Sequence, residues 1–182
     1  MKEFAASPFA AEMIRTVSDM YAKGWDERNG GNVSMLLTED ELSEYVDPAK
    51  VIRSFPLGFS VPGMDGRILL VTGTGKYFRN IKQTSGNDLG IVRIADCGRT
   101  AELLWGFMDG GKPTSELAAH LMCHEARLAA DPAHRVLTHC HPANVIAMTF
   151  VHSLDEREFT RSLWRTMTES ISGHYCPLLR FI

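Results

Sequence analysis

Two histidines flank a cysteine near residue 140, in the order His139-Cys140-His141. The residues from Arg135 onward are typical of a β-strand, and on a strand residues i and i+2 point to the same face. Both imidazoles could therefore reach one metal ion while Cys140 points away from it. Taken alone the pattern is weak, because a polar strand end would look the same.

A carboxylate offers a further candidate ligand. Glu116 follows Thr114 and Ser115 in the first turn of a predicted helix. It could simply complement the helix dipole there, or it could act as a metal ligand or as a general base beside the metal. Three protein ligands and one open position form the catalytic pattern of zinc.

Two glycine-rich turns could bind an anion. They are Asn29-Gly30-Gly31-Asn32 and Thr72-Gly73-Thr74-Gly75-Lys76. Each could turn backbone N–H groups toward a phosphate, although an ordinary turn is the alternative. The second turn is not a Walker loop, because Tyr77 stands where Ser or Thr is needed, and no dinucleotide fingerprint is present. A phosphate bound here would belong to a small sugar phosphate.

A second histidine pair, His120 and His124, has helical i, i+4 spacing. The residue after His120 is Leu121, so the zinc-protease pattern H-E-x-x-H is absent. We interpret both histidines as structural or partly buried polar residues, with a second metal pair as the alternative. No G-x-S-x-G pattern of a serine hydrolase is present either.

Composition restricts the class of protein. The chain has 182 residues, the length of about one domain, with 19 Lys+Arg against 22 Asp+Glu and a net charge of −3. This balance argues against nucleic-acid binding driven by charge. No apolar run approaches a membrane span, no signal peptide is visible, and the four cysteines form no C-x-x-C pair. We expect a cytoplasmic protein with no membrane or nucleic-acid partner.

Short strands alternate with helices along the chain. Ser7-Pro8 caps a helix that ends near Gly24, and a second helix is expected from Pro113 to Asp131. Two further helices are expected over residues 143–150 and 155–167. Strands are expected over residues 33–37, 68–71, 89–94, 101–105 and 135–141, the third and fourth forming a hairpin. This mixture indicates a layered α/β or α+β domain.

These pieces, in this order, resemble the class II (zinc) aldolase family, which also contains the adducin head domain. The resemblance rests on residues 24–32, residues 71–80, Leu104-Trp105-Gly106, residues 113–117, and His139-Cys140-His141 with Asn144. The first two segments are most similar to the branch that acts on L-rhamnulose 1-phosphate.

The resemblance implies an α/β fold, a three-layer α/β/α sandwich with a mainly antiparallel central sheet, assembled as a homotetramer. It implies one zinc ion per subunit on His139, His141 and a third histidine, with Glu116 as ligand and as acid/base. It also implies retro-aldol cleavage to dihydroxyacetone phosphate and L-lactaldehyde in rhamnose catabolism. Glu169 is implied to reach a neighbouring subunit's site. The residues implied to bind the phosphate are Asn29, Gly31, Asn32, Thr72, Gly73, Thr74, Gly75, Thr114 and Ser115.

The implied chemistry agrees with these residues. Breaking the bond between C3 and C4 of a ketose leaves electron density that needs a sink, and a Lewis-acidic zinc ion provides one. Glu116 would return the proton to C3. A Schiff-base lysine is the alternative sink, with Lys76 and Lys112 as candidates. Neither lies in an apolar run of the kind that activates such a lysine, so zinc is favoured.

The resemblance stops near Glu169. We expect an incomplete class II aldolase-like domain over residues 1–169 and a divergent tail over residues 170–182, as in a truncated or frame-shifted product with its C-terminal part missing. His174 has the wrong spacing for the third zinc ligand. Two alternatives therefore stay open: a non-enzymatic binding module like the adducin head, and a related zinc enzyme such as a sugar-phosphate epimerase or dehydratase.

Overall fold

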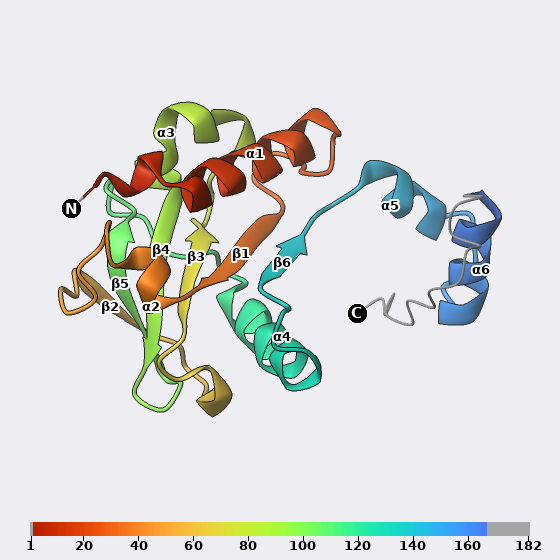
Figure 1. The fold of residues 1–182 in the computed structure, drawn as a ribbon. Helices are drawn as coiled ribbons and strands as arrows, with labels where there is room; N and C mark the ends of the chain where they lie inside the picture. The colour runs from red at the N-terminus through yellow and green to blue at the C-terminus, as the bar shows by residue number, and fades with distance from the viewer. Residues whose placement is uncertain (1, 167–182) are drawn as a thin grey trace. The chain divides into compact units, whose positions relative to one another are not determined.

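A computed structural model describes residues 2–166 of the chain. The chain divides into two compact units, Met1–His141 and Pro142–Ile182. Figure 1 labels their helices and strands. The helices of the first unit are η1 (Phe4–Ala6), α1 (Pro8–Ala22), α2 (Glu39–Leu42), η2 (Pro62–Met64), η3 (Phe78–Asn80), α3 (Ile81–Asp88) and α4 (Leu117–Ala130). Its strands are β1 (Asn32–Leu37), β2 (Arg53–Pro56), β3 (Ile68–Thr72), β4 (Leu89–Ala95), β5 (Thr100–Gly106) and β6 (Val136–His139).

The six strands form one sheet in the order β2-β5-β4-β3-β1-β6. Each of the five neighbouring pairs is antiparallel. The strand β1 lies between β3 and β6, with Asn32 opposite His139 and Ser34 opposite Val71. The start of β1 therefore lies beside the ends of β3 and β6.

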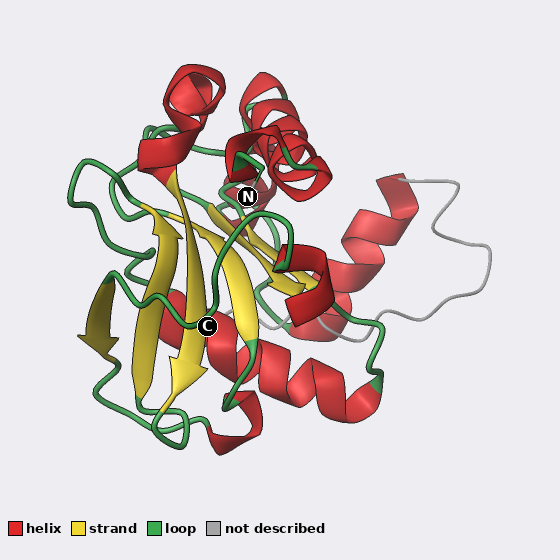
Figure 2. Ribbon diagram, turned by 60° about the vertical axis from the view of Figure 1, so that its left-hand side comes forward, coloured by secondary structure: helices red, strands yellow, loops and turns green. Residues whose placement is uncertain are grey.

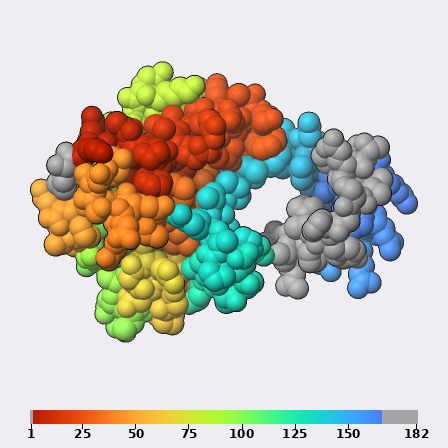
Figure 3. Space-filling view, in the orientation of Figure 1, coloured from red at the N-terminus to blue at the C-terminus, as the bar shows by residue number. Residues whose placement is uncertain are grey.

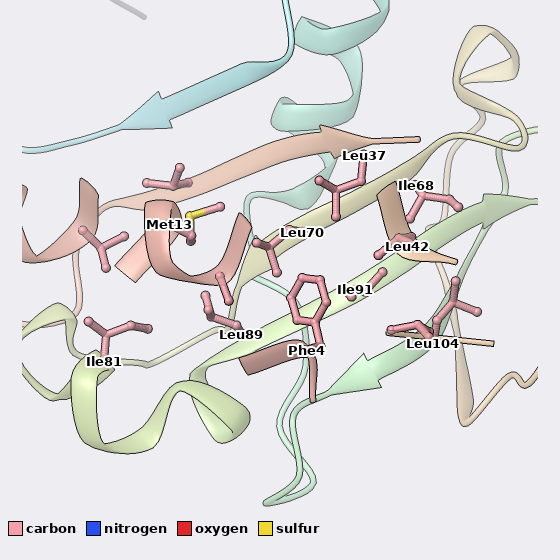
Figure 4. Packing of buried hydrophobic residues seen from close by; sticks show 14 of the residues in the cluster. Phe4, Met13, Leu37, Leu42, Ile68, Leu70, Ile81, Leu89, Ile91 and Leu104 are labelled. Carbon is pink, nitrogen blue, oxygen red and sulfur yellow. The ribbon is translucent and has the colours of Figure 1, made fainter. Parts of the chain in front are cut away.

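Helices cover both faces of this sheet (Figure 2). On one face, Phe4 and side chains of α1, α2 and α3 pack against Leu70, Ile91 and their neighbours, as Figure 4 shows. On the other face, Leu117 and Leu121 of α4 pack against alternate strand residues, among them Leu69, Val71 and Val92. The expected three-layer α/β/α arrangement with an antiparallel sheet is confirmed.

Local sequence explains several of these elements. Ser7 accepts a hydrogen bond from the backbone N–H of Ala10 at 3.1 Å, and Pro8 follows as the first residue of α1. In the space-filling view the residues of α1, in red, occupy the upper part of the first unit (Figure 3). The β4–β5 hairpin turns at Asp96, Cys97 and Gly98, all with positive φ. The helix α1 and this hairpin were both expected.

Two predicted boundaries in the first unit are wrong. The helix α4 begins at Leu117, so Glu116 lies at the N-cap position and not in the first turn. The strand β6 ends at His139, two residues early, because the backbone N–H of His141 donates to the carbonyl oxygen of Trp25 at 2.6 Å and leaves the sheet. The elements β2, α2 and α3 were not predicted.

The second unit is helical where the structure describes it. It contains α5 (Ala143–Thr149) and α6 (Glu156–Thr166), close to the two helices expected there. No helix within residues 2–166 is long and apolar enough to cross a membrane.

Candidate active site

The segments predicted to do chemistry meet at one end of the sheet. Asn32 begins β1, Thr72 ends β3 and His139 ends β6. The backbone N–H of Val33 donates to Oγ1 of Thr72 at 3.1 Å, and the N–H of Thr114 donates to the carbonyl oxygen of Thr72 at 3.0 Å. These hydrogen bonds bring the two glycine-rich turns and the start of α4 beside the histidine-containing strand end.

Glu116 and the two strand-end histidines lie close together. Oε2 of Glu116 lies 2.5 Å from Nδ1 of His139, within reach of a charge-assisted hydrogen bond. The rings of His139 and His141 have centroids 4.8 Å apart, although His141 lies beyond the end of the strand. The side chains of His139 and Glu116 are 37% and 44% exposed, so a substrate in solution can reach them.

The first glycine-rich turn packs tightly on these histidines. A Cβ atom on Gly30 would lie 2.8 Å from Nδ1 of His141 and 2.9 Å from the carbonyl oxygen of Glu27. Gly31 has φ +91°, and a Cβ there would lie 3.1 Å from the carbonyl oxygen of His139. Side chains at these two positions would push the turn off the histidine segment, which explains why both are glycine.

Several backbone N–H groups of the two glycine-rich turns are hydrogen-bonded within the protein. The N–H of Gly30 donates to Glu27 at 2.7 Å, that of Gly73 to Asp88 at 2.7 Å and that of Thr74 to Lys112 at 3.0 Å. All three acceptors are backbone carbonyl oxygens, so these donors are already used. These three N–H groups are therefore not available to a phosphate, and the predicted role of the two turns stays a prediction for their remaining groups.

The residues predicted to bind phosphate differ in exposure. Asn29, Thr74, Gly75 and Ser115 are exposed, whereas Asn32, Thr72, Gly73 and Thr114 are buried or nearly so. Oγ1 of Thr114 accepts a hydrogen bond from the N–H of Glu116 at 3.3 Å, which connects this segment to the carboxylate. Glu169 lies outside the described residues.

A network of buried polar side chains lies next to this site, and the sequence analysis identified only its two histidines. Oγ of Ser34 lies 2.6 Å from Nδ1 of His120 and 2.8 Å from Nε2 of His124. Nε2 of His120 also contacts Oδ1 of Asn32. Both histidines are buried and hydrogen-bonded, in agreement with a structural interpretation. The i, i+4 histidine spacing was visible in the sequence, whereas Ser34 could have been noticed only as a polar residue within an apolar strand.

Asp26, in the segment before the first turn, was also missed. It is buried, and its Oδ1 has no hydrogen-bond partner among residues 2–166. Burial raises the pKa of this carboxyl group. Asp26 lies within the segment 24–32 that carries the family resemblance, but its burial could not be read from the sequence.

The donor atoms at the end of β6 are of types that bind zinc. Two imidazole nitrogens and a carboxylate oxygen are among the ligands zinc accepts in catalytic sites. His139 lies next to both Glu116 and His141. In the part of the chain that the structure describes, however, no group of three or more His, Cys, Asp or Glu side chains is arranged to hold a metal ion. The side chains of His139, His141 and Glu116 are therefore suitable zinc ligands in their chemistry, but they form only part of a ligand set.

Lys76, the candidate for a Schiff-base lysine, is engaged in ion pairs. Its ammonium group pairs with Asp109 and lies 3.7 Å from Oδ1 of the buried Asp88. The hydrogen bond from Lys76 lowers the pKa of Asp109. A Schiff base on Lys76 would require both ion pairs to break.

The chain is similar in sequence to curated aldolases. Over 170 residues the chain is 48% identical to "Rhamnulose-1-phosphate aldolase" of Listeria monocytogenes serotype 4a (strain HCC23). The aligned region covers 93% of this chain and 62% of that protein. The protein of the same name from Enterococcus faecalis (strain ATCC 700802 / V583) is 47% identical, with 91% and 59% covered. The chain thus spans about three-fifths of the length of these relatives.

A solved structure shares the fold. A sugar-phosphate aldolase from Thermotoga maritima superposes with a TM-score of 0.65 at 27% sequence identity, covering 88% of this chain and 66% of that one. The sequence pattern described as "Class II Aldolase and Adducin N-terminal domain" matches residues 11–179. The match covers most of the chain, and the chain belongs to the class II aldolase and adducin N-terminal domain family.

Proposed function

We propose that this chain carries the active-site residues of a zinc-dependent aldolase that cleaves L-rhamnulose 1-phosphate to dihydroxyacetone phosphate and L-lactaldehyde. The observation that carries the proposal is the 2.5 Å contact between Glu116 and His139, with His141 beside them. It supports an acid/base group next to metal-binding nitrogens. The names of the curated relatives agree with this substrate.

In this proposal His139, His141 and Glu116 hold one zinc ion per chain. When bound, zinc supplies a Lewis acid for the electron density left on the substrate's oxygens. The set is partial, and a third histidine would have to come from outside the described residues. Exposure of both His139 and Glu116 leaves room for such a ligand and for substrate.

Glu116 is the proposed acid/base. Cleavage breaks the bond between C3 and C4, the C4 hydroxyl loses its proton as the aldehyde forms, and C3 must gain one. Oε2 of Glu116 can hold that proton and return it, because the carboxylate is half-exposed beside a hydrogen-bonding imidazole. Glu169, from a neighbouring subunit of a homotetramer, is proposed as a second catalytic group.

The phosphate would lie at the sheet end, bound by side-chain donors. Asn29, Asn32, Thr74, Thr114 and Ser115 offer amide and hydroxyl hydrogens there, and Thr72, Gly73, Gly75 and Gly31 shape the turns that carry them. Backbone donors contribute less, since several are used within the protein. A cytoplasmic location fits a substrate that is phosphorylated inside the cell.

The test combines metal content with product analysis on the full chain. After zinc loading and gel filtration, elemental mass spectrometry should give about one zinc per chain, falling to near zero in His139→Ala. Incubation with L-rhamnulose 1-phosphate should release dihydroxyacetone phosphate, and a chelator should stop the release.

Other outcomes would contradict the proposal in distinct ways. Zinc uptake with a rearranged but intact carbon skeleton would indicate an epimerase or dehydratase. A saturable protein partner without zinc or turnover would indicate a binding module. Cleavage that survives both Glu116→Ala and His139→Ala would place the chemistry elsewhere.

A further inference from the structure

A chain of buried polar side chains leads from the interior of the first unit to the candidate active site. It runs from His124 to Ser34, then to His120, and ends at Asn32. The side chains of Ser34 and His124 are 0% and 1% exposed, and those of His120 and Asn32 are 4% and 5% exposed. The proposed reaction assigns no role to the first three of these residues.

The atoms that face one another fix the direction of each hydrogen bond. Oδ1 of Asn32 can only accept, so Nε2 of His120 must carry a proton and donate it. The imidazole of His120 is buried between two uncharged partners, Ser34 and Asn32, which favours its neutral form with Nδ1 as an acceptor. The Ser34 hydroxyl therefore donates to Nδ1, and Oγ accepts from Nε2 of His124.

This direction determines which end of the Asn32 amide faces the site. With Oδ1 held by His120, the Nδ2 group points the other way, toward His139, whose Nδ1 lies 3.4 Å away. Nδ1 of His139 lies much closer to Oε2 of Glu116, at 2.5 Å, and 3.4 Å is long for a hydrogen bond between Nδ2 and Nδ1. The hydrogens of Nδ2 remain available to another acceptor.

We propose that His120, held in one tautomer by Ser34 and His124, is a positioning residue that fixes the Asn32 amide with Nδ2 directed at the phosphate of the substrate. This rests on the function proposed above. The backbone N–H of His120 donates to the carbonyl oxygen of the proposed zinc ligand Glu116 at 3.1 Å, as expected within a helix. The imidazole of His120 instead contacts Ser34 and Asn32, and in this scheme it acts through Asn32. An asparagine free to rotate would present its carbonyl oxygen to the phosphate in part of the molecules, and two acceptors repel.

The two histidines form a matched pair for the test. Both lie on α4, both are buried and both bond to Ser34, but only His120 contacts Asn32. Leucine at either position removes one imidazole from the same interior. A role in stability alone predicts similar consequences for the two variants, whereas positioning of Asn32 predicts different ones.

The first measurement needs no variant. Long-range ¹H–¹⁵N correlation spectra of the full chain distinguish the two histidine tautomers. We expect His120 with its proton on Nε2. A proton on Nδ1 would mean that Asn32 presents its Nδ2 to His120, and would overturn the proposal.

The second measurement is binding of dihydroxyacetone phosphate by calorimetry, with dihydroxyacetone as the probe that lacks phosphate. One well-placed hydrogen bond to a charged group is worth about a tenfold change in affinity. His120→Leu should weaken binding roughly tenfold, and His124→Leu less than about threefold. His120→Gln, which keeps a donor near the position of Nε2, should restore most of the affinity.

The outcomes separate this proposal from the function on which it rests. Equal weakening by the two leucine variants, at comparable melting temperatures, would overturn the positioning role and leave the aldolase proposal intact. The wild-type chain could instead fail to bind the phosphate probe while the Asn32 side-chain amide signals shift in His120→Leu and not in His124→Leu. That result would support the positioning of Asn32 and contradict the proposed function.

Discussion

The first unit contains two histidine pairs in opposite environments. His139 and His141 lie at and just beyond a strand end, and the side chain of His139 is partly exposed beside the similarly exposed Glu116. His120 and His124 lie inside the unit, where they share the hydroxyl of Ser34. Burial costs an imidazole its solvation and must be offset by hydrogen bonds, whereas an exposed imidazole is free to bind a ligand. The comparison therefore predicts ligand binding at the first pair and a structural role for the second, in which His120 also holds the Asn32 amide.

The largest effect should follow from Glu116. Glu116→Gln removes the proposed proton carrier but keeps the size of the side chain, so cleavage of L-rhamnulose 1-phosphate should fall by roughly 10²–10⁴-fold. Stability should hardly change, because the side chain is almost half exposed. A coupled assay for dihydroxyacetone phosphate measures the loss.

The matched control is Glu12→Gln, on the exposed surface of α1, where Glu12 pairs with Arg15. Its activity should equal that of the wild type. If Glu116→Gln keeps more than a tenth of the wild-type rate, Glu116 is not the acid/base group.

The next effect concerns the buried pair. Ser34→Ala deprives two buried imidazoles of their shared partner at once, at an expected cost of about 3 kcal/mol of unfolding free energy. Urea denaturation measures it. Ser43→Ala is the control, since the Ser43 hydroxyl donates to the Asp40 carbonyl oxygen at the exposed surface. Its cost should stay below about 0.5 kcal/mol.

The burial of His120 and His124 should also make the free energy of unfolding depend on pH. Burial lowers the pKa of both His120 and His124 to about 4, from 6.5. Between these values the unfolded chain binds more protons than the folded one, so stability is full above pH 6.5 and is lost as the pH falls toward 4. Between pH 8 and pH 5 each histidine should account for about 2 kcal/mol.

Substitution of one buried histidine isolates its share of that loss. His124→Gln should reduce the drop in unfolding free energy between pH 8 and pH 5 by about 2 kcal/mol. The exposed His152 offers the control, since its substitution should leave the drop unchanged. An identical pH dependence in His124→Gln and the wild type would show that His124 is not buried as a neutral imidazole.

Much of the fold could be predicted because it depends on local patterns. Ser7-Pro8 marks the start of α1, and the apolar run that begins at Ile68 predicts β3. The strand β2 (Arg53–Pro56) was missed because it lies at the sheet edge and half of its residues are exposed. The helix α3 (Ile81–Asp88) was missed because it is largely polar, with Ile81 packed into the core.

The site was predictable in its residue types and not in its arrangement. Histidine spacing and glycine-rich turns identified the segments, and resemblance to a family joined them. The register that sets Asn32 opposite His139 is a contact across more than a hundred residues, which no local pattern encodes. The hydrogen bonds from the N–H groups of Gly73 and Thr74 to the carbonyl oxygens of Asp88 and Lys112 likewise depend on how distant parts of the chain fold together.

The smallest effect should come from His139 itself, and it is the strictest test of the comparison. In metal-free buffer His139→Gln should change the unfolding free energy by at most about 1 kcal/mol, because the imidazole and its carboxylate partner are both substantially exposed. Urea denaturation with a chelator present is required, since zinc bound to the folded wild type alone would raise its apparent stability. The same variant should nevertheless lose zinc. A loss of 3 kcal/mol without metal would instead make His139 as structural as His124, and the distinction between the two pairs would fail.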